Sequence, residues 1–159
     1  MTYILNKADR DLFYSRNDAK DRRLGELIHR ARVCDLRSGT IAIIGIPEDR
    51  GIAANKGRSG ASLAPDEIRR KLYKLTPGFT MDFGRITVVD TGNLCNDGLT
   101  LEEVHLAEQE AVAEIVSYGA IPLVLGGGHD LTYPGLAGLV QGANIGHDGL
   151  GLINVDAHL

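Results

Sequence analysis

Residues 150–159 read Leu-Gly-Leu-Ile-Asn-Val-Asp-Ala-His-Leu. The apolar and β-branched residues over 150–155 are typical of a buried strand. Side chains two positions apart in a strand point to the same face, so Asp156 and His158 would lie together at its carboxyl end. A carboxylate and an imidazole in this arrangement predict a metal site.

The rest of the chain alternates predicted strands with predicted helices. We expect strands at 41–46, 86–89, 121–125 and 150–155, and helices at 20–36, 65–75, 100–118 and 131–140. Residues 1–17 show no clear period, and 48–62 are a polar loop. This alternation predicts an α/β fold of three layers, with helices on both faces of a mostly parallel, doubly wound sheet. Such folds place their sites at the carboxyl ends of the strands.

Two of the predicted helices carry a signal for their first turn. Thr100 and Glu103 have the spacing of a capping box, and Asp130 is expected to cap the helix that follows it. His29 and His105 fall on predicted helices away from the strand ends. We interpret both as surface or core residues.

Composition excludes several classes of protein. The 159 residues suffice for one domain with a core, and a net charge of −4 argues against a nucleic-acid or acidic-membrane surface. The two cysteines, Cys34 and Cys95, form neither a metal motif nor a disulfide framework, which indicates a reducing compartment. Residues 1–20 lack the apolar segment of a signal peptide, and no run of 18 apolar residues occurs, so we expect neither a signal peptide nor a membrane span. We therefore expect a cytoplasmic protein.

A glycine-rich turn, Gly-Gly-Gly-His-Asp at 126–130, follows the predicted strand at 121–125. Its glycines allow a sharp turn and a close approach of other groups, and they would present His129 just past the strand end. Alone, the turn is equally consistent with a surface histidine. Together, His129, Asp156 and His158 would bring two imidazoles and a carboxylate to one edge, a donor set that suits Mn, Fe, Co or Zn.

These two motifs, with a third, resemble the ureohydrolase family of arginases, agmatinases and formimidoylglutamases. The third motif contains Gly-Ile-Pro-Glu-Asp-Arg-Gly at 45–51, Asn-Lys-Gly-Arg-Ser-Gly-Ala at 55–61 and Pro-Asp-Glu-Ile-Arg-Arg at 65–70. Its spacing looks most like that of the formimidoylglutamase branch. The resemblance covers residue 41 to the end, and the motifs occur in the family's order.

The resemblance implies an arginase-like fold and a binuclear Mn²⁺ centre. His129 matches a ligand of one metal, Asp156 the bridging ligand, and His158 a ligand of the second metal. The metals would lower the pKa of a bound water, which attacks a formimidoyl or guanidino carbon and releases formamide or urea. Asn55 and Arg58 would contact the carboxylate end of a small-molecule amidine or guanidino substrate, although a solvated loop explains them equally well. Family members are often homo-oligomers.

The family's next aspartate ligand would follow Leu159, and its later ligands and proton-handling residues lie further on. No catalytic acid or base is therefore assigned. We expect residues 1–159 to form the N-terminal portion of a single ureohydrolase-like domain, inactive alone because two adjacent cations need more than one carboxylate. The preferred reaction converts formimidoylglutamate to glutamate and formamide.

Three alternatives stay open. An agmatinase or arginase would release urea, and a zinc deacetylase of the same general fold would use a similar Asp-x-His. A truncated remnant, or a module that associates with another chain, would have no activity.

Overall fold

The computed structural model describes residues 3–78, 82–145 and 149–155. In these residues a five-stranded sheet has the order β1-β4-β3-β5, with β2 also paired to β4. The strands are β1 (Leu5–Asn6), β2 (His29–Arg30), β3 (Ile41–Gly45), β4 (Val88–Leu94) and β5 (Ile121–Leu125). β1 is antiparallel to β4 and the other pairings are parallel.

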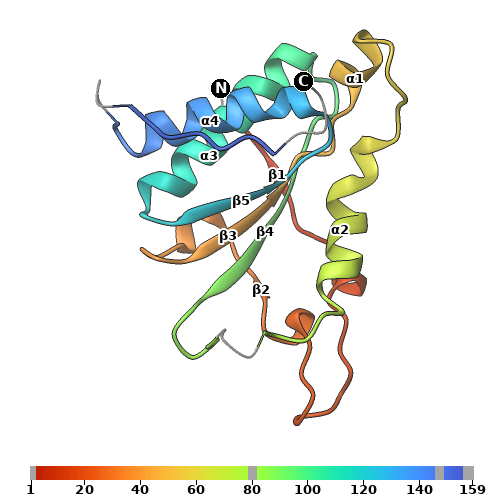
Figure 1. Ribbon diagram of the computed structural model, residues 1–159, viewed down its shortest axis with the longest axis vertical. Helices are drawn as coiled ribbons and strands as arrows, with labels where there is room; N and C mark the ends of the chain where they lie inside the picture. The colour runs from red at the N-terminus through yellow and green to blue at the C-terminus, as the bar shows by residue number, and fades with distance from the viewer. Residues whose placement is uncertain (1–2, 79–81, 146–148, 156–159) are drawn as a thin grey trace.

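Helices lie on both sides of this sheet (Figure 1). The α-helices are α1 (Arg50–Ala54), α2 (Ala64–Leu72), α3 (Leu101–Ser117) and α4 (Thr132–Gly142). The 3₁₀ turns are η1 (Arg10–Leu12), η2 (Leu24–Glu26), η3 (Val33–Asp35), η4 (Ala61–Leu63) and η5 (His129–Leu131). The prediction of an incomplete three-layer α/β fold is confirmed. Within the described part, none of these helices combines the length and the apolar character needed to span a bilayer.

β3 is an interior strand of the sheet, between β4 and β5, and is apolar along its length, as expected for a strand covered on both faces. Ala42 and Ile44 pack into one core cluster together with α3 residues such as Val104. Ile43, which points to the opposite face, packs into a second cluster with Tyr73 at the end of α2. Alternate residues of one strand thus bind the two helical layers to the sheet.

The predicted strands at 41–46 and 121–125 correspond to β3 and β5, and the predicted helices at 65–75 and 100–118 correspond to α2 and α3. The capping box of α3 is present as well. The amide N of Glu103 donates to Thr100 Oγ1 at 3.2 Å, and the amide N of Thr100 donates to Glu103 Oε2 at 2.8 Å. The 48–62 segment is more ordered than a loop, because it contains α1.

The predicted helix at 20–36 is wrong. That segment forms η2, β2 and η3, and β2 pairs in parallel with β4. The amide groups of Leu24 and Gly25 donate to the carbonyls of Leu75 and Tyr73 at the end of α2. A Cβ on Gly25 would lie 2.6 Å from the carbonyl oxygen of Tyr14. Tertiary hydrogen bonds and close packing therefore replace the local helix that the apolar spacing favoured.

The strand predicted at 86–89 begins later and runs further, as β4, so Asp90, Thr91 and Gly92 lie within the strand. The pairing with β3 shifts between Ile43 and Ile44, which marks a bulge. Gly92 has φ +97°, and a Cβ there would lie 2.0 Å from the carbonyl oxygen of Asn6. Gly92 is thus part of the bulge, which is a common place for a glycine inside a strand, and it does not end β4.

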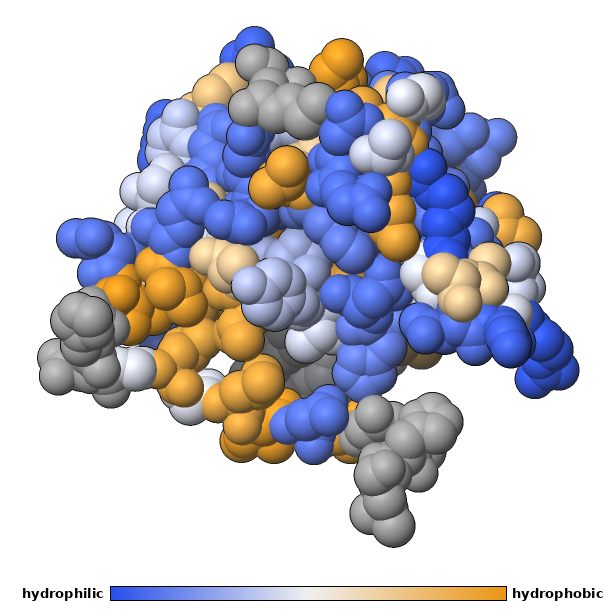
Figure 2. All heavy atoms as spheres, turned by 90° about the horizontal axis from the view of Figure 1, so that it is seen from above, coloured by the Kyte–Doolittle hydropathy of each residue, from blue (hydrophilic) through white to orange (hydrophobic). Residues whose placement is uncertain are grey.

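The strand predicted at 150–155 is not formed in its described residues. Leu152 lies against a cavity between β5, α3 and α4, while Val155 is 94% exposed. Seen from above, hydrophobic residues gather along one side of the molecule around a hollow (Figure 2). A strand needs a neighbour for its backbone hydrogen bonds, and β5, the last strand in the order, pairs only with β3 in the described sheet.

Candidate functional site at the carboxyl edge of the sheet

The loops that follow β3 and β5 meet at the carboxyl edge of the sheet. The amide N of Ile46 donates to the carbonyl of Leu125 at 2.8 Å, and the amide N of Gly128 donates to the carbonyl of Glu48 at 3.0 Å. A Cβ on Gly127 would lie 1.9 Å from that same Glu48 oxygen. The glycine-rich turn therefore lies so close to the β3 loop that position 127 has no room for a side chain.

Glu48 is the anchor of the β3 loop. Its side chain is 2% exposed and pairs with the guanidinium of Arg50, whose Nη1 also donates to the carbonyl of Leu99 at 2.6 Å. The hydrogen bonds from Arg50 hold the pKa of Glu48 below its usual value, and they outweigh the opposing effect of burial. Asn96 Nδ2 donates to the carbonyl of Pro47 at 2.8 Å, which ties in the segment after β4. Loops from three strands thus form one connected edge.

His129, the described member of the predicted ligand set, lies in η5 at this edge and is exposed. Asp156 and His158 lie outside the described residues. The structure therefore places His129 where the sequence predicted it, past the end of β5.

Asp130 does not cap α4, which corrects the prediction from the sequence. α4 begins at Thr132 after the η5 turn, with no side-chain hydrogen bond at its N-cap. The carboxylate of Asp130 instead meets His105 of α3, with Asp130 Oδ2 and His105 Nε2 3.0 Å apart. The interpretation of His105 as remote from the strand ends is therefore also wrong. α3 follows β4, and its first turns, which carry His105, lie beside the turn after β5.

Asn55 and Arg58, the predicted substrate contacts, follow α1. Asn55 is the C-cap of α1 and its Nδ2 donates to the carbonyl of Gly51 at 3.0 Å. Both side chains are exposed. α1 packs beside the turn of His129, since a Cβ on Gly128 would lie 3.2 Å from Ile52 Cγ1.

A buried acid that we did not predict lies between α3 and α4. Glu108 is fully buried, and neither of its carboxylate oxygens has a hydrogen-bond partner in the described part of the chain. It borders an otherwise mostly apolar cavity of about 360 Å³. Burial, followed by the negative charge of Asp130, raises the pKa of Glu108 to about 8. Helical spacing gave a signal, because Glu108 falls four residues after Val104 and four before Val112 on the inner face of α3.

The fold and these motifs agree with the comparisons with known proteins. The chain matches the model of the arginase family over residues 39–159. It belongs to the arginase family.

Its relatives include formimidoylglutamases. The protein of that name from Klebsiella pneumoniae is 39% identical over 121 residues, which are 76% of this chain and 36% of that protein. The one from Ralstonia nicotianae is 34% identical over 161 residues, covering 96% of this chain and 47% of that protein. A crystal structure of Trypanosoma cruzi formiminoglutamase with Mn²⁺ is 31% identical with a TM-score of 0.67, and the match covers 77% of this chain and 41% of that one. The chain thus spans less than half the length of each of these relatives.

The family's metal can be tested against the described donors. In residues 3–78, 82–145 and 149–155 no cluster of three His, Cys, Asp or Glu side chains could hold an ion. His129 nevertheless fits as one ligand, because its exposed imidazole lies in the turn at the carboxyl edge of the sheet. A complete site needs donors beyond this one.

Proposed function

We propose that the chain forms the N-terminal portion of a single arginase-family domain that hydrolyses a linear amidine. The preferred substrate is formimidoylglutamate, which with one water gives glutamate and formamide. The single observation that carries this proposal is the glycine-rich turn of His129, fastened to the β3 loop at the carboxyl edge of an arginase-type sheet. The identities of 34–39% to formimidoylglutamases favour that substrate over arginine and agmatine.

In this proposal His129, Asp156 and His158 are ligands of Mn²⁺. The metal, when bound, would supply a water of lowered pKa for attack on the amidine carbon. The chain's own contribution is to hold His129 in place, since Glu48 accepts from the backbone of the turn and is itself held by Arg50. Such support keeps a ligand in the geometry that its metal requires.

Asn55 and Arg58 are proposed to bind the carboxylate end of the substrate. A guanidinium matches a carboxylate with two parallel hydrogen bonds, and formimidoylglutamate carries two carboxylates. The exposure of Arg58 beyond α1, which packs beside η5, supports this role.

An assay of formamide and urea release would test the proposal. The 159-residue chain, and the continuous protein wherever the reading frame extends past Leu159, would be incubated with Mn²⁺ and formimidoylglutamate, agmatine or arginine. We expect formamide release by the continuous protein and none by the 159-residue chain. Urea release from agmatine or arginine alone would reject formimidoylglutamate as the substrate. If the continuous protein hydrolyses none of the three compounds, the proposal that it is an amidine hydrolase is rejected.

Matched variants of the continuous protein would test the site residues. We expect His129→Ala to abolish activity and lower the Mn²⁺ content, whereas His29→Ala, an exposed histidine in β2, should change neither. Arg58→Ala should raise KM for formimidoylglutamate, and Arg85→Ala, an exposed arginine before β4, is its control. An unchanged KM in Arg58→Ala would remove Arg58 from the substrate site.

A further inference from the structure

We propose that His105 and Asp130 are a positioning pair that sets the orientation of His129. The proposal rests on the proposed function in one respect, the role of His129 as a ligand. His105 and Asp130 would themselves touch neither metal nor substrate. They would act by fixing the turn that carries the ligand.

The first step is the space made for the Asp130 carboxylate. A Cβ on Gly51 of α1 would lie 2.3 Å from Asp130 Oδ2, and a Cβ on Gly128 would lie 2.1 Å from Asp130 Oδ1. Glycines from two different segments therefore leave room for this one carboxylate. A side chain at either position would force this carboxylate to move.

The second step is the direction in which the carboxylate is held. His105 Nε2 and Asp130 Oδ2 are 3.0 Å apart, and the two side chains are 28% and 27% exposed. The contact joins residues 25 positions apart, from the first half of α3 to the turn after β5. A hydrogen bond between partly buried groups restricts orientation more than an exposed pair does.

The third step is the rigidity of the element that carries His105. α3 is capped at its N-terminus by Thr100 and Glu103, and Val104, next to His105, is fully buried in the core under β3. The imidazole of His105 therefore extends from a fixed helix. Since Asp130 follows His129 directly, a fixed Asp130 side chain restricts the backbone from which His129 extends.

A pair of this kind has a chemical precedent in the general behaviour of metal sites. Groups that orient a ligand through hydrogen bonds change metal affinity by about 10–100-fold when they are removed. His105 differs from them in acting one residue away, through Asp130 and the backbone. We therefore expect an effect near the lower end of that range.

The experiment compares His105→Leu with His105→Gln. Leucine fills a similar volume without a donor, whereas the glutamine amide can donate to Asp130 from nearly the position of Nε2. Two readouts are measured in the 159-residue chain and in the continuous protein. They are the ¹H–¹⁵N correlations of the His129 ring, recorded without metal, and the Kd of Mn²⁺ alone by electron paramagnetic resonance.

We expect His105→Leu to shift the His129 ring signals and to weaken Mn²⁺ binding about tenfold. His105→Gln should restore both, and His29→Leu is the control. Unfolding in urea checks that each variant is folded. If His105→Leu lowers stability while the His129 signals and the Mn²⁺ Kd stay unchanged, the pair is only a packing contact and the proposal is overturned.

The two readouts also separate this inference from the proposed function. If the continuous wild-type protein does not bind Mn²⁺ but His105→Leu still shifts the His129 signals, the role of His129 as a ligand is rejected and the positioning pair stands. If the wild-type protein binds Mn²⁺ and both variants behave like it, the positioning pair fails alone.

Discussion

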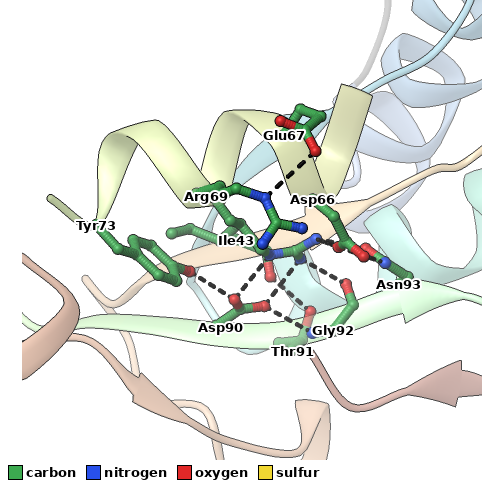
Figure 3. A network of polar contacts seen from close by, with 10 residues as sticks. Ile43, Asp66, Glu67, Arg69, Tyr73, Asp90, Thr91, Gly92 and Asn93 are labelled. Atoms are coloured by element: carbon green, nitrogen blue, oxygen red, sulfur yellow. Dashed lines mark hydrogen bonds and ion pairs between the residues drawn. The ribbon is translucent and has the colours of Figure 1, made fainter. Parts of the chain in front are cut away.

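Two buried acids, Asp90 in β4 and Glu108 in α3, show how partners decide the state of a buried charge. Both side chains are essentially inaccessible to solvent. Asp90 accepts hydrogen bonds from Arg69 Nε at 2.8 Å, Arg69 Nη2 at 2.9 Å and the hydroxyl of Tyr73 at 2.5 Å (Figure 3). Glu108 has no such donor among the described residues. Equal burial therefore accompanies a fully bonded ion pair in one place and an unbonded acid in the other.

The pKa shifts follow the same division. Burial has the largest single effect on the pKa of Arg69 and lowers it, but the hydrogen bonds to Asp90 and the charges of Asp90 and Asp66 together outweigh burial, so that pKa lies above its usual value. Burial and the charge of Asp90 together raise the pKa of Tyr73, so its hydroxyl remains a donor. The pKa of Glu108 is raised to about 8, first by burial, so this acid is mostly neutral at neutral pH.

The largest expected effect comes from breaking the ion pair. Arg69→Met would leave the Asp90 carboxylate buried without its cation, and we expect the free energy of unfolding to fall by about 3–5 kcal/mol in urea titrations. Arg70→Met is the matched control on the same helix, because its pair with Glu67 is exposed and should contribute less than about 1 kcal/mol. If Arg69→Met lowered the free energy of unfolding no more than Arg70→Met does, Asp90 would have to find another partner.

Glu108→Gln should instead raise the free energy of unfolding. Below pH 4.5, the ordinary pKa, Glu108 is neutral whether the chain is folded or unfolded. Between pH 4.5 and about 8 it ionises only in the unfolded chain, so the wild-type protein loses stability as the pH rises. We expect the glutamine variant to be more stable than wild type by about 2–4 kcal/mol at pH 9 and by little at pH 4.5. A pH-independent difference in urea unfolding would mean that Glu108 has a partner.

The parts of the fold that were predicted correctly are those determined by local pattern. β3 and β5 are apolar runs bounded by glycine or proline, and α3 carries its own capping box. The segment at 20–36 has helical spacing too, but its amides bond to the carbonyls that end α2. A single sequence does not reveal that competition, because the competing carbonyls of Tyr73 and Leu75 lie 48 residues from Gly25 and 51 from Leu24.

The candidate site was also predicted only in the part that follows from local pattern. Strand order and glycine content sufficed to place His129 at the carboxyl edge, since the carboxyl ends of parallel strands share one edge. The contacts that support it were not predicted. His105 with Asp130, and Arg50 with the Leu99 carbonyl, join residues 25 and 49 positions apart, and only the folded chain brings them together.

Tyr73→Phe sharpens the comparison by removing one donor from Asp90 while leaving the arginine in place. A hydrogen bond to a charged group contributes about 1.5–3 kcal/mol, so we expect a loss of about 2 kcal/mol in urea unfolding. Tyr14→Phe, an exposed tyrosine whose ring lies near Lys74 Nζ, is the control and should lose little. If Tyr73→Phe costs no more than Tyr14→Phe, the two bonds from Arg69 are sufficient for Asp90.

The smallest expected effect concerns the helix that carries Glu108. Besides Glu108, which has no hydrogen-bond partner among the described residues, α3 carries a separately stabilised first turn, where Thr100 and Glu103 cap the helix. Thr100→Ala removes the cap and should cost about 1 kcal/mol in urea unfolding. Thr132→Ala at the start of α4, where no side chain caps the helix, is the matched control and should be nearly neutral. Because the cap and Glu108 lie two turns apart without a shared partner, the effects of Thr100→Ala and Glu108→Gln should add. A change in stability of the double variant that differs from the sum of the two single changes would show that the cap and the buried acid are coupled through α3.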